Sequence, residues 1–376
     1  MFLSLPRAAT AVALAAVAVV ATAVSPASAN TSNWRDISPP GSEGSVLRDV
    51  ETGGGATWAI GRRTDAATGS SAPVALRWTR AGWQAAPRPA DQDRLEDLTV
   101  GAPDQVWAVG TRNETVDGTE KGHERALLQH WNGSAWNEVT LPFPEGVDQS
   151  TLSAVDTDAD GAVWVYGGYT NTAGEYFSAL FRGDADGSGH WTLLPADTGL
   201  TWVSQLKAVP GDGTYAIGDG ISRFDGTSWT RQNMPPTLEG AMFDGIALQT
   251  TTNEVWAAGY IRDETLWRRP VIVRYDGRSW RMVRTPAETG QLSDIAFDGS
   301  GRPVAVGETL DPAVSPDGNY VLTPGPRGSL IQSEELPGAG YLHAAATDSA
   351  GRIWAVGGAA GAENGMSPSA YAGIRR

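Results

Sequence analysis

A four-residue segment that reads aromatic-Ala-x-Gly, or close to it, recurs seven times along the chain. The first residues of successive copies lie 49, 57, 51, 41, 48 and 50 positions apart. A repeat of this period indicates an array of one small unit, because a single unit cannot bury its own apolar face. The seven copies are Trp58–Gly61, Trp107–Gly110, Trp164–Gly167, Tyr215–Gly218, Trp256–Gly259, Val304–Gly307 and Trp354–Gly357.

Each repeat has the chemistry of β-structure. Asn132-Gly133, Asp225-Gly226 and Asp276-Gly277 are dipeptides that tolerate positive φ at both central positions of a hairpin turn. The segments between turns are short and rich in Val, Ile, Trp and Tyr, without a long helical periodicity. Four strands in a unit of about 50 residues match one blade of a β-propeller. The sequence therefore predicts an all-β, seven-bladed β-propeller with four antiparallel strands in each blade.

The last repeat lacks a fourth strand of its own. Leu342–Arg376 has room for only the first strands of a blade, whereas Asn33–Pro39 aligns with the outer-strand segment Ser279–Pro286. We therefore expect the N-terminal strand to complete the last blade and to close the ring.

The beginning of the chain has the pattern of a secretory signal peptide. Arg7 supplies a positive charge, Ala8–Val24 is an apolar run, and Ala27–Ala29 is a small-residue cleavage signal. A membrane anchor is the alternative, but the run is short and rich in alanine. We expect a signal peptide at 1–29, a single propeller domain at 30–376, and a secreted, extracellular protein.

Composition argues against several classes of function. The chain has no cysteine, so it has no disulfide scaffold, thiol nucleophile or cysteine-ligated metal. The formal net charge of −15 argues against nucleic acid and anionic membranes as partners. No phosphate-binding loop, nucleophile elbow or dinucleotide fingerprint occurs. We expect a monomer that uses no cofactor.

Tryptophan is unusually abundant, with 15 residues. Most of them fall at repeat positions, where large apolar side chains would fill the space between blades. These are Trp34, Trp58, Trp78, Trp83, Trp107, Trp131, Trp136, Trp164, Trp191, Trp229, Trp256, Trp280 and Trp354. Trp202 and Trp267 fall outside the repeat.

In a propeller, the loops between strands two and three share one face with the connections between blades. These loops vary most in length here, and binding residues concentrate on irregular loops held by a rigid scaffold. Trp202 lies in a blade-to-blade connection, and Trp267 lies in a loop between strands two and three, beside Arg268 and Arg269. We predict that these four residues bind a partner. The alternative is that each indole packs on its own loop.

Acidic residues recur on the inner strands. Asp49, Asp97 and Asp294 hold the same repeat position, so they could ring the mouth of the central channel. One interpretation is a site that binds or cleaves carbohydrate with paired carboxylates. The other is that each carboxylate bonds the backbone of a neighbouring blade. His343 begins an inner strand and is the histidine expected to face the channel, where it could act as a general base.

Asp156, Asp158 and Asp160 alternate before Gly161, as in the opening of a calcium-binding loop. The twelfth position of such a loop would be Gly167, which has no carboxylate. The same segment is also the hairpin between the first two strands of its blade, where turn residues are expected. We predict no metal site, with a calcium-stabilised loop as the alternative.

In most repeats, glycine ends strand two and tryptophan lies on strand four, and this pattern is similar to that of kelch-type propellers. The chain departs from the kelch pattern in that paired glycines end strand two only at Gly167-Gly168 and Gly357-Gly358. By its blade pattern, export signal and composition, the chain resembles secreted actinobacterial seven-bladed β-propellers. This resemblance implies a non-enzymatic protein that binds a secreted neutral metalloprotease, similar to dispase, and promotes its autolysis. It also implies a glutamine-donor substrate of an extracellular transglutaminase.

The glutamine content fits such a donor, because ten glutamines stand against two lysines. Gln92 and Gln149 are predicted in blade-to-blade loops, and Gln332 is predicted on the outer strand of blade six. We take these three as the candidate transglutaminase-reactive glutamines. The alternative is that each of them is an ordinary surface glutamine whose amide contacts only solvent.

Overall fold

The computed structural model describes residues 33–65, 67–68, 71–86, 93–116, 119–184, 190–262, 267–286, 289–309, 318–332, 336, 338–359 and 369–375. Their strands form seven antiparallel sheets of four strands each, which confirms the predicted seven-bladed β-propeller. The predicted signal peptide lies outside the described residues.

The first three blades follow one another along the chain. Blade 1 has β2 (Ser45–Gly53), β3 (Ala56–Thr64), β4 (Ser71–Thr79) and β5 (Gly82–Ala85). Blade 2 has β6 (Asp93–Ala102), β7 (Gln105–Val116), β8 (Thr119–Trp131) and β9 (Trp136–Glu138). Blade 3 has β10 (Val147–Thr157), β11 (Val163–Asn171), β12 (Tyr176–Gly183) and β13 (Trp191–Leu194).

The next three blades repeat this order. Blade 4 has β14 (Val203–Val209), β15 (Gly213–Gly218), β16 (Ile221–Phe224) and β17 (Trp229–Arg231). Blade 5 has β18 (Met242–Gln249), β19 (Glu254–Arg262), β20 (Arg268–Tyr275) and β21 (Trp280–Val283). Blade 6 has β22 (Gly290–Phe297), β23 (Pro303–Thr309), β24 (Gly318–Pro324) and β25 (Leu330–Gln332).

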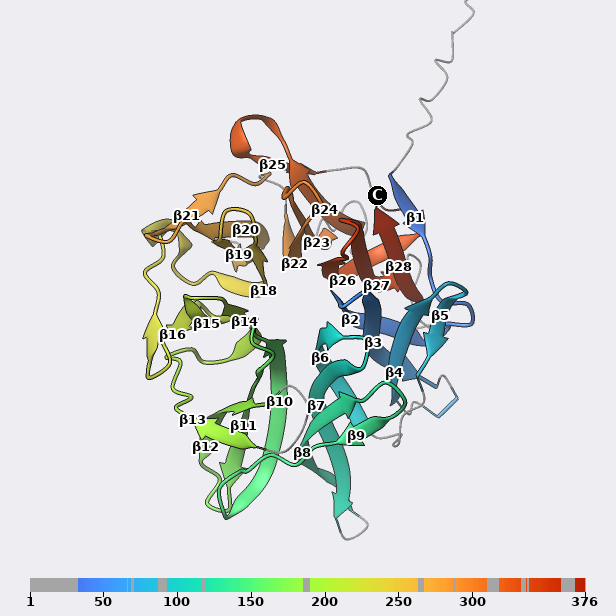
Figure 1. The fold of residues 1–376 in the computed structure, drawn as a ribbon, viewed down its shortest axis with the longest axis vertical. Helices are drawn as coiled ribbons and strands as arrows, with labels where there is room; N and C mark the ends of the chain where they lie inside the picture. Colours follow the sequence, from blue (N-terminus) through green and yellow to red (C-terminus); the bar gives the residue numbers. More distant parts are fainter. Residues whose placement is uncertain are drawn as a thin grey trace, which may run out of the picture. The chain divides into compact units, whose positions relative to one another are not determined.

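Blade 7 is made from both ends of the described chain. Its strands are β26 (Ala339–Thr347), β27 (Ile353–Ala359), β28 (Ala370–Arg375) and, outermost, β1 (Trp34–Asp36). Trp34 pairs with Arg375, and Asp36 pairs with Gly373. The prediction that the N-terminal strand completes the last blade is therefore confirmed (Figure 1).

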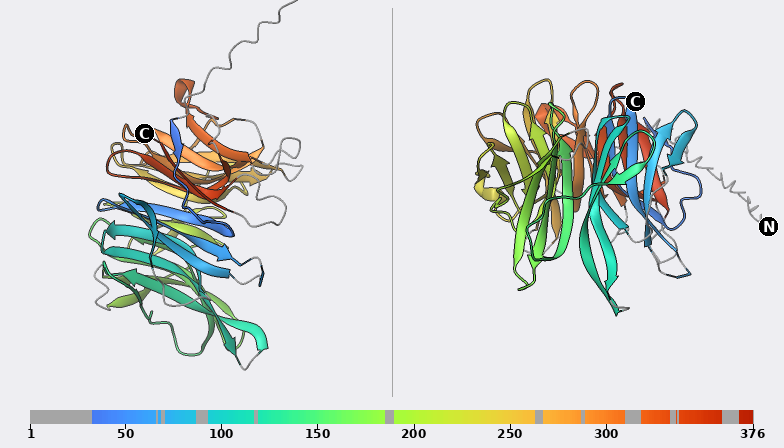
Figure 2. Two further views of the ribbon diagram at one scale, coloured as in Figure 1. Left: turned by 90° about the vertical axis from the view of Figure 1, so that its right-hand side faces the viewer. Right: turned by 60° about the horizontal axis from the view of Figure 1, so that its bottom comes forward.

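The ring closes through its inner strands. Each of β2, β6, β10, β14, β18, β22 and β26 contacts the inner strand of the next blade, and β26 contacts β2 (Figure 1). The hairpin of β7 and β8 projects from the ring (Figure 2). Among the described residues the helices are the short 3-10 turns η1 (Pro236–Leu238) and η2 (Pro326–Gly328), and no helix there is long and apolar enough to cross a membrane.

Apolar packing occurs between neighbouring blades. Seven buried clusters each combine residues of two adjacent blades. Trp58 of blade 1, for example, lies 5.1 Å from Trp131 and 5.5 Å from Trp136 of blade 2, measured between ring centroids. The thirteen repeat tryptophans are buried or half-buried, whereas Trp202 and Trp267 are 39% and 41% exposed. The predicted division of the tryptophans is confirmed.

Candidate functional site

The repeat glycines lie against the inner strands just before a shared irregularity in strand pairing. The last glycine of each aromatic-Ala-x-Gly segment faces the inner strand at close range. A Cβ on Gly307, for example, would lie 2.0 Å from the carbonyl oxygen of Gln291 and 2.8 Å from the Cα of Leu292. A Cβ on any of the other six repeat glycines would likewise lie 1.8–2.0 Å from a carbonyl oxygen of the inner strand or, for Gly218, of Trp202 just before it. Only glycine fits where the two backbones approach so closely.

Directly after this contact, every inner strand contains a β-bulge. The pairing with strand two skips one residue, for example between Leu292 and Asp294. A bulged residue leaves the ladder, and the bulge redirects its side chain. The skipped residues are Arg48, Glu96, Ser153, Ser204, Asp244, Ser293 and His343. They lie near the start of each inner strand, on the face of the blade-to-blade connections, which we call the loop face.

Six bulge residues line one cavity at the loop face, which we call the mouth. The mouth has a volume of about 250 Å³. The bulge residues that line it are Arg48, Glu96, Ser204, Asp244, Ser293 and His343. A guanidinium, two carboxyl groups, an imidazole and two hydroxyls from six different blades thus converge on one small space.

Burial changes the proton affinity of two groups in the mouth. It lowers the pKa of His343 to about 4, and the positive charges of Arg48 and Arg62 add to this shift. It raises the pKa of Asp244 to about 6, and Arg268 partly offsets this shift. At neutral pH the imidazole is therefore neutral, and the Asp244 carboxyl is largely ionised.

A second network lies beside Asp244. The guanidinium of Arg268 lies 4.7 Å from the ring centroid of Tyr260 and donates a hydrogen bond to the side chain of Gln291, which lines the mouth. Gln291 Nε2 in turn donates to Glu308 Oε1 at 2.5 Å. These contacts fix one wall of the mouth.

The repeated inner-strand acids join blades. Asp49 Oδ2 accepts a hydrogen bond from the backbone N–H of Leu98 at 2.9 Å. Asp97 Oδ2 accepts from Val155 N at 2.7 Å, and Asp294 Oδ2 accepts from Ala345 N at 2.8 Å. Each donor belongs to the next blade, so the alternative that these acids bond a neighbouring blade is confirmed. Burial raises the pKa of all three carboxyls.

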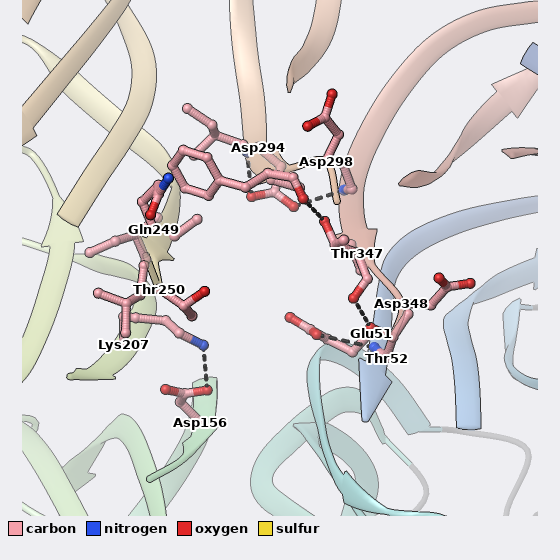
Figure 3. Close-up of a pocket in the computed structure, with 18 of the residues that line it drawn as sticks. Glu51, Thr52, Asp156, Lys207, Gln249, Thr250, Asp294, Asp298, Thr347 and Asp348 are labelled. Atoms are coloured by element: carbon pink, nitrogen blue, oxygen red, sulfur yellow. Dashed lines mark hydrogen bonds and ion pairs between the residues drawn. The ribbon is translucent and has the colours of Figure 1, made fainter. Parts of the chain in front are cut away.

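A wider cavity of about 680 Å³ opens at the opposite end of the channel, on the face of the hairpins between strands one and two. We call it the hairpin-face cavity. Lys207 Nζ donates to Asp156 Oδ1 at 3.0 Å, and Asp156 Oδ2 accepts from Ala208 N at 2.7 Å. Figure 3 shows Glu51 and Lys207 pointing toward one another across this space.

The aspartates of the calcium alternative do not converge. Asp156 lines the channel beside Lys207. Asp158 caps its hairpin, accepting from Asp160 N at 3.0 Å and from Trp164 Nε1 at 3.0 Å. Asp160 is exposed. Among the residues that the structure describes, no group of three or more His, Asp or Glu side chains is placed to hold a metal ion.

The predicted partner-binding residues lie on the loop face but differ in exposure. Trp202 precedes β14 and Trp267 precedes β20, and both are exposed, as is Arg269. Arg268 is half-buried and turned to Tyr260 and Gln291. Tyr176 and Phe177, at the start of β12, are also exposed on this face, 62% and 42% respectively. We did not predict them, because they fall within a strand rather than in a long loop.

The candidate glutamines have different settings. Gln332 is exposed on β25, the outer strand of blade 6, as predicted. Gln149 is half-buried within β10, where it pairs with Thr170, so its predicted loop position is wrong. The extension of β10 back to Val147 pairs this segment with the end of β11. Gln92 lies outside the described residues.

Comparison with solved structures supports the fold. A streptogramin B lyase matches with a TM-score of 0.60 and 10% identity, over 91% of this chain and 97% of its own. Virginiamycin B lyase from Staphylococcus aureus matches with a TM-score of 0.58 and 12% identity, over 91% and 99%. The extracellular domain of a putative hybrid two-component system from B. thetaiotaomicron matches with a TM-score of 0.56 and 14% identity, over 90% and 39%. No protein-family model and no curated protein matches the sequence.

These neighbours correct one prediction and leave another unsupported. We expected a protein without enzymatic activity, and this prediction is corrected: the structures that share this ring include two lyases, so the fold gives no ground for excluding catalysis. The identities are low, so the likeness establishes the seven-bladed propeller fold alone. The resemblance to actinobacterial propellers such as the dispase autolysis-inducing protein finds no support among these structures.

Proposed function

We propose that the protein is an acid–base enzyme of the lyase type, acting at the mouth on a carboxylate-bearing sugar such as a uronate. The observation that carries this proposal is the convergence of six bulge residues, of differing chemistry, on one cavity. Polar groups gathered in a small space, with carboxyl and imidazole pKa values moved from their usual range, are typical of catalytic sites.

Each group has a role in an elimination. Asp244, with a pKa of about 6, is ionised at neutral pH and removes the proton from the carbon beside the substrate carboxylate. Arg48 binds that carboxylate and stabilises the charge that develops on it. The electrons of the broken C–H bond form a carbon–carbon double bond, and the C–O bond to the leaving group breaks. Neutral His343 donates a hydrogen bond to the leaving oxygen, which takes its proton from solvent.

The structural neighbours support the reaction class, and the mouth supports the substrate class. Two solved propellers of this size are named as lyases, although their substrates cannot be transferred to this chain at 10% and 12% identity. The substrate is inferred from chemistry: the guanidinium of Arg48, which has no ion pair with the described residues, suits a carboxylate, and the hydroxyl of Ser293 suits a polyhydroxylated ring.

A screen of uronate-containing oligosaccharides and polysaccharides tests this proposal. The unsaturated product of elimination absorbs ultraviolet light, so turnover is followed directly. We expect Asp244→Asn and Arg48→Met each to lower the rate by about a hundredfold or more while circular dichroism stays unchanged. Asp160→Asn and Arg35→Met, both exposed and away from the mouth, are matched controls that should retain the rate. The proposal fails if no substrate is turned over, or if Asp244→Asn keeps full activity.

A second proposal concerns secretion and partners. Trp202 and Trp267 are exposed on the loop face together with Tyr176 and Phe177, and exposed aromatic side chains are typical anchors of protein interfaces. We propose that the secreted protein binds an extracellular metalloprotease there, promoting its autolysis, and that an extracellular transglutaminase modifies exposed Gln332. This role is compatible with an enzyme whose mouth lies on the same face.

Purified metalloprotease and transglutaminase test the second proposal. The double change Trp202→Ala with Trp267→Ala should weaken binding of the protease, whereas exposed Met282→Ala on the outer strand β21 should not. Mass spectrometry should find a labelled amine on Gln332. The second proposal would be rejected if the double variant bound the protease as tightly as the unchanged protein and Gln332 remained unlabelled.

A further inference from the structure

The hairpin-face cavity is a second polar space in the channel, at the opposite end from the mouth, with Asp97 and Gln205 lining both. Its walls come from the ends of all seven inner strands, from Thr52 of blade 1 to Thr347 of blade 7. Its volume of about 680 Å³ is sufficient for a small polar ligand. The proposed lyase reaction uses none of the side chains that point into it.

Glu51 differs from the inner-strand aspartates that line this cavity. Asp97, Asp156 and Asp294 each accept a hydrogen bond from the backbone of the next blade. Glu51 does not reach another blade, because Oε2 accepts only from the adjacent Thr52 N, at 3.2 Å. Its other oxygen has no hydrogen-bond partner among the described residues. The carboxyl group of Glu51 is therefore not needed to hold the ring together.

Lys207 faces Glu51 and keeps spare hydrogen-bond donors. A lysine ammonium has three N–H groups. One of them bonds Asp156 Oδ1 at 3.0 Å, and no ion pair joins Lys207 to Glu51 within the described part of the chain. Figure 3 shows the two side chains on facing walls, with open space between them.

We propose that the hairpin-face cavity binds a small zwitterion, an α-amino acid or a dipeptide. The ligand carboxylate accepts hydrogen bonds from Lys207 Nζ, and the ligand ammonium donates to Glu51. A small ligand that carries both a carboxylate and an ammonium group can contact Lys207 and Glu51 at the same time, because these two side chains lie on opposite walls of the cavity. A ligand with only one charge would leave one of the two groups unmatched. This proposal is independent of the reaction proposed at the mouth.

Binding should depend on pH through Glu51. Burial raises the pKa of Glu51 to about 8, with Lys207 opposing the shift and nearby carboxylates adding to it. The charged groups around it are Asp49 on its own strand, Asp97 on β6, Asp156 on β10, Lys207 on β14, Asp294 on β22, Asp298 after β22 and Asp348 after β26. A ligand ammonium favours the ionised carboxylate, so binding releases a proton and affinity rises with pH up to about pH 8.

Calorimetry with defined probes tests the proposal. The zwitterionic probes are glycine, L-alanine and L-alanyl-L-alanine; N-acetyl-L-alanine and L-alaninamide each lack one charge. We expect at least one zwitterion to bind, about tenfold or more tighter than either singly charged probe. Its affinity should rise about tenfold or more from about pH 6 to about pH 8. Buffers of different ionisation enthalpy should report a released proton.

Variants separate this site from general effects on the fold. Glu51→Gln keeps the shape of the side chain and should remove both the pH dependence and most of the affinity. Glu254→Gln, in the ion pair of Glu254 with Arg274 at 3.3 Å, is the matched control and should change neither. Lys207→Met leaves Asp156 buried without its cation, so it is made together with Asp156→Asn, and this pair should also abolish binding. The proposal is overturned if no zwitterion binds at millimolar concentration, if singly charged probes bind equally well, or if Glu51→Gln binds like the unchanged protein.

Discussion

The two ends of the channel are built by the same seven strands, yet their side chains have different tasks. At the loop face, the bulge frees one residue of each inner strand from the ladder, and Arg48, Glu96, Asp244 and His343 line the mouth. Further along the strands, acids such as Asp97 are bonded to the next blade. The contrast shows that the channel acids expected from the repeat are structural. The residues available for chemistry sit one position earlier, at the bulges.

The largest effect is expected where the bulge is created. Gly307→Ala would place a Cβ 2.0 Å from the carbonyl oxygen of Gln291, so β22 and β23 would have to separate. We expect a loss of about 3 kcal/mol or more in the free energy of unfolding. Gly101→Ala is the matched control, since the nearest atom to its Cβ would be 3.7 Å away. Chemical denaturation measures both. Equal stability of the two variants would refute the requirement for glycine at this backbone contact.

The two ends of the channel should also respond to pH in opposite directions. The pKa of His343 is lowered to about 4 in the folded state, so the unfolded chain binds its proton first and stability is lost as pH falls from about 6.5 toward 4. The pKa of Glu51 is raised to about 8, so the folded state holds a proton that the unfolded chain releases, and stability falls as pH rises from about 4.5 to 8.

Melting temperatures across this range separate the two contributions. His343→Gln should flatten the acidic side of the profile, and Glu51→Gln should flatten the neutral side. If either variant keeps the full pH profile of the unchanged protein, the assigned pKa shift is wrong for that end of the channel.

The smallest effect is expected at the exposed tryptophan of the loop face. Trp202→Ala should change the free energy of unfolding by no more than about 0.5 kcal/mol, because the indole is 39% exposed and lies outside the repeat. Trp58→Ala is the internal contrast, because that indole is fully buried between blades and its removal should cost about 3–5 kcal/mol. Similar losses for the two variants would show that Trp202 supports the fold rather than a contact surface.

The repeat made the fold predictable, since its period, its turn dipeptides and the Trp34 segment together specify seven blades and their closure. The site was only partly predictable. His343 was expected in the channel, but Arg48 and Asp244 follow Leu47 and Phe243 in ordinary-looking strands. Their exposure to the mouth depends on a skipped pairing, which is a property of two strands in register. The signal that was present is the glycine of every repeat, whose close contact with the inner-strand backbone lies directly before that skip.

Loop assignments failed for a similar reason. Gln149 was expected in a connection between blades, but Val147 to Ser150 extend β10 by pairing with the end of β11. Tyr176 and Phe177 were overlooked because strand residues are usually buried on at least one face, whereas these two begin β12 at the edge of the loop face. In both cases the length of strand pairing decided exposure, and local composition does not encode that length.

The pH dependence of turnover tests the central claim, that the bulge residues of the mouth form the active site. For a uronate substrate, kcat/KM should rise with pH and reach half its maximum near pH 6, where Asp244 ionises. Arg268→Met removes the charge that opposes the raised pKa of Asp244, so it should move this midpoint to higher pH. A profile that is flat through this range, or a midpoint that Arg268→Met leaves in place, would contradict the assignment of Asp244 as the base.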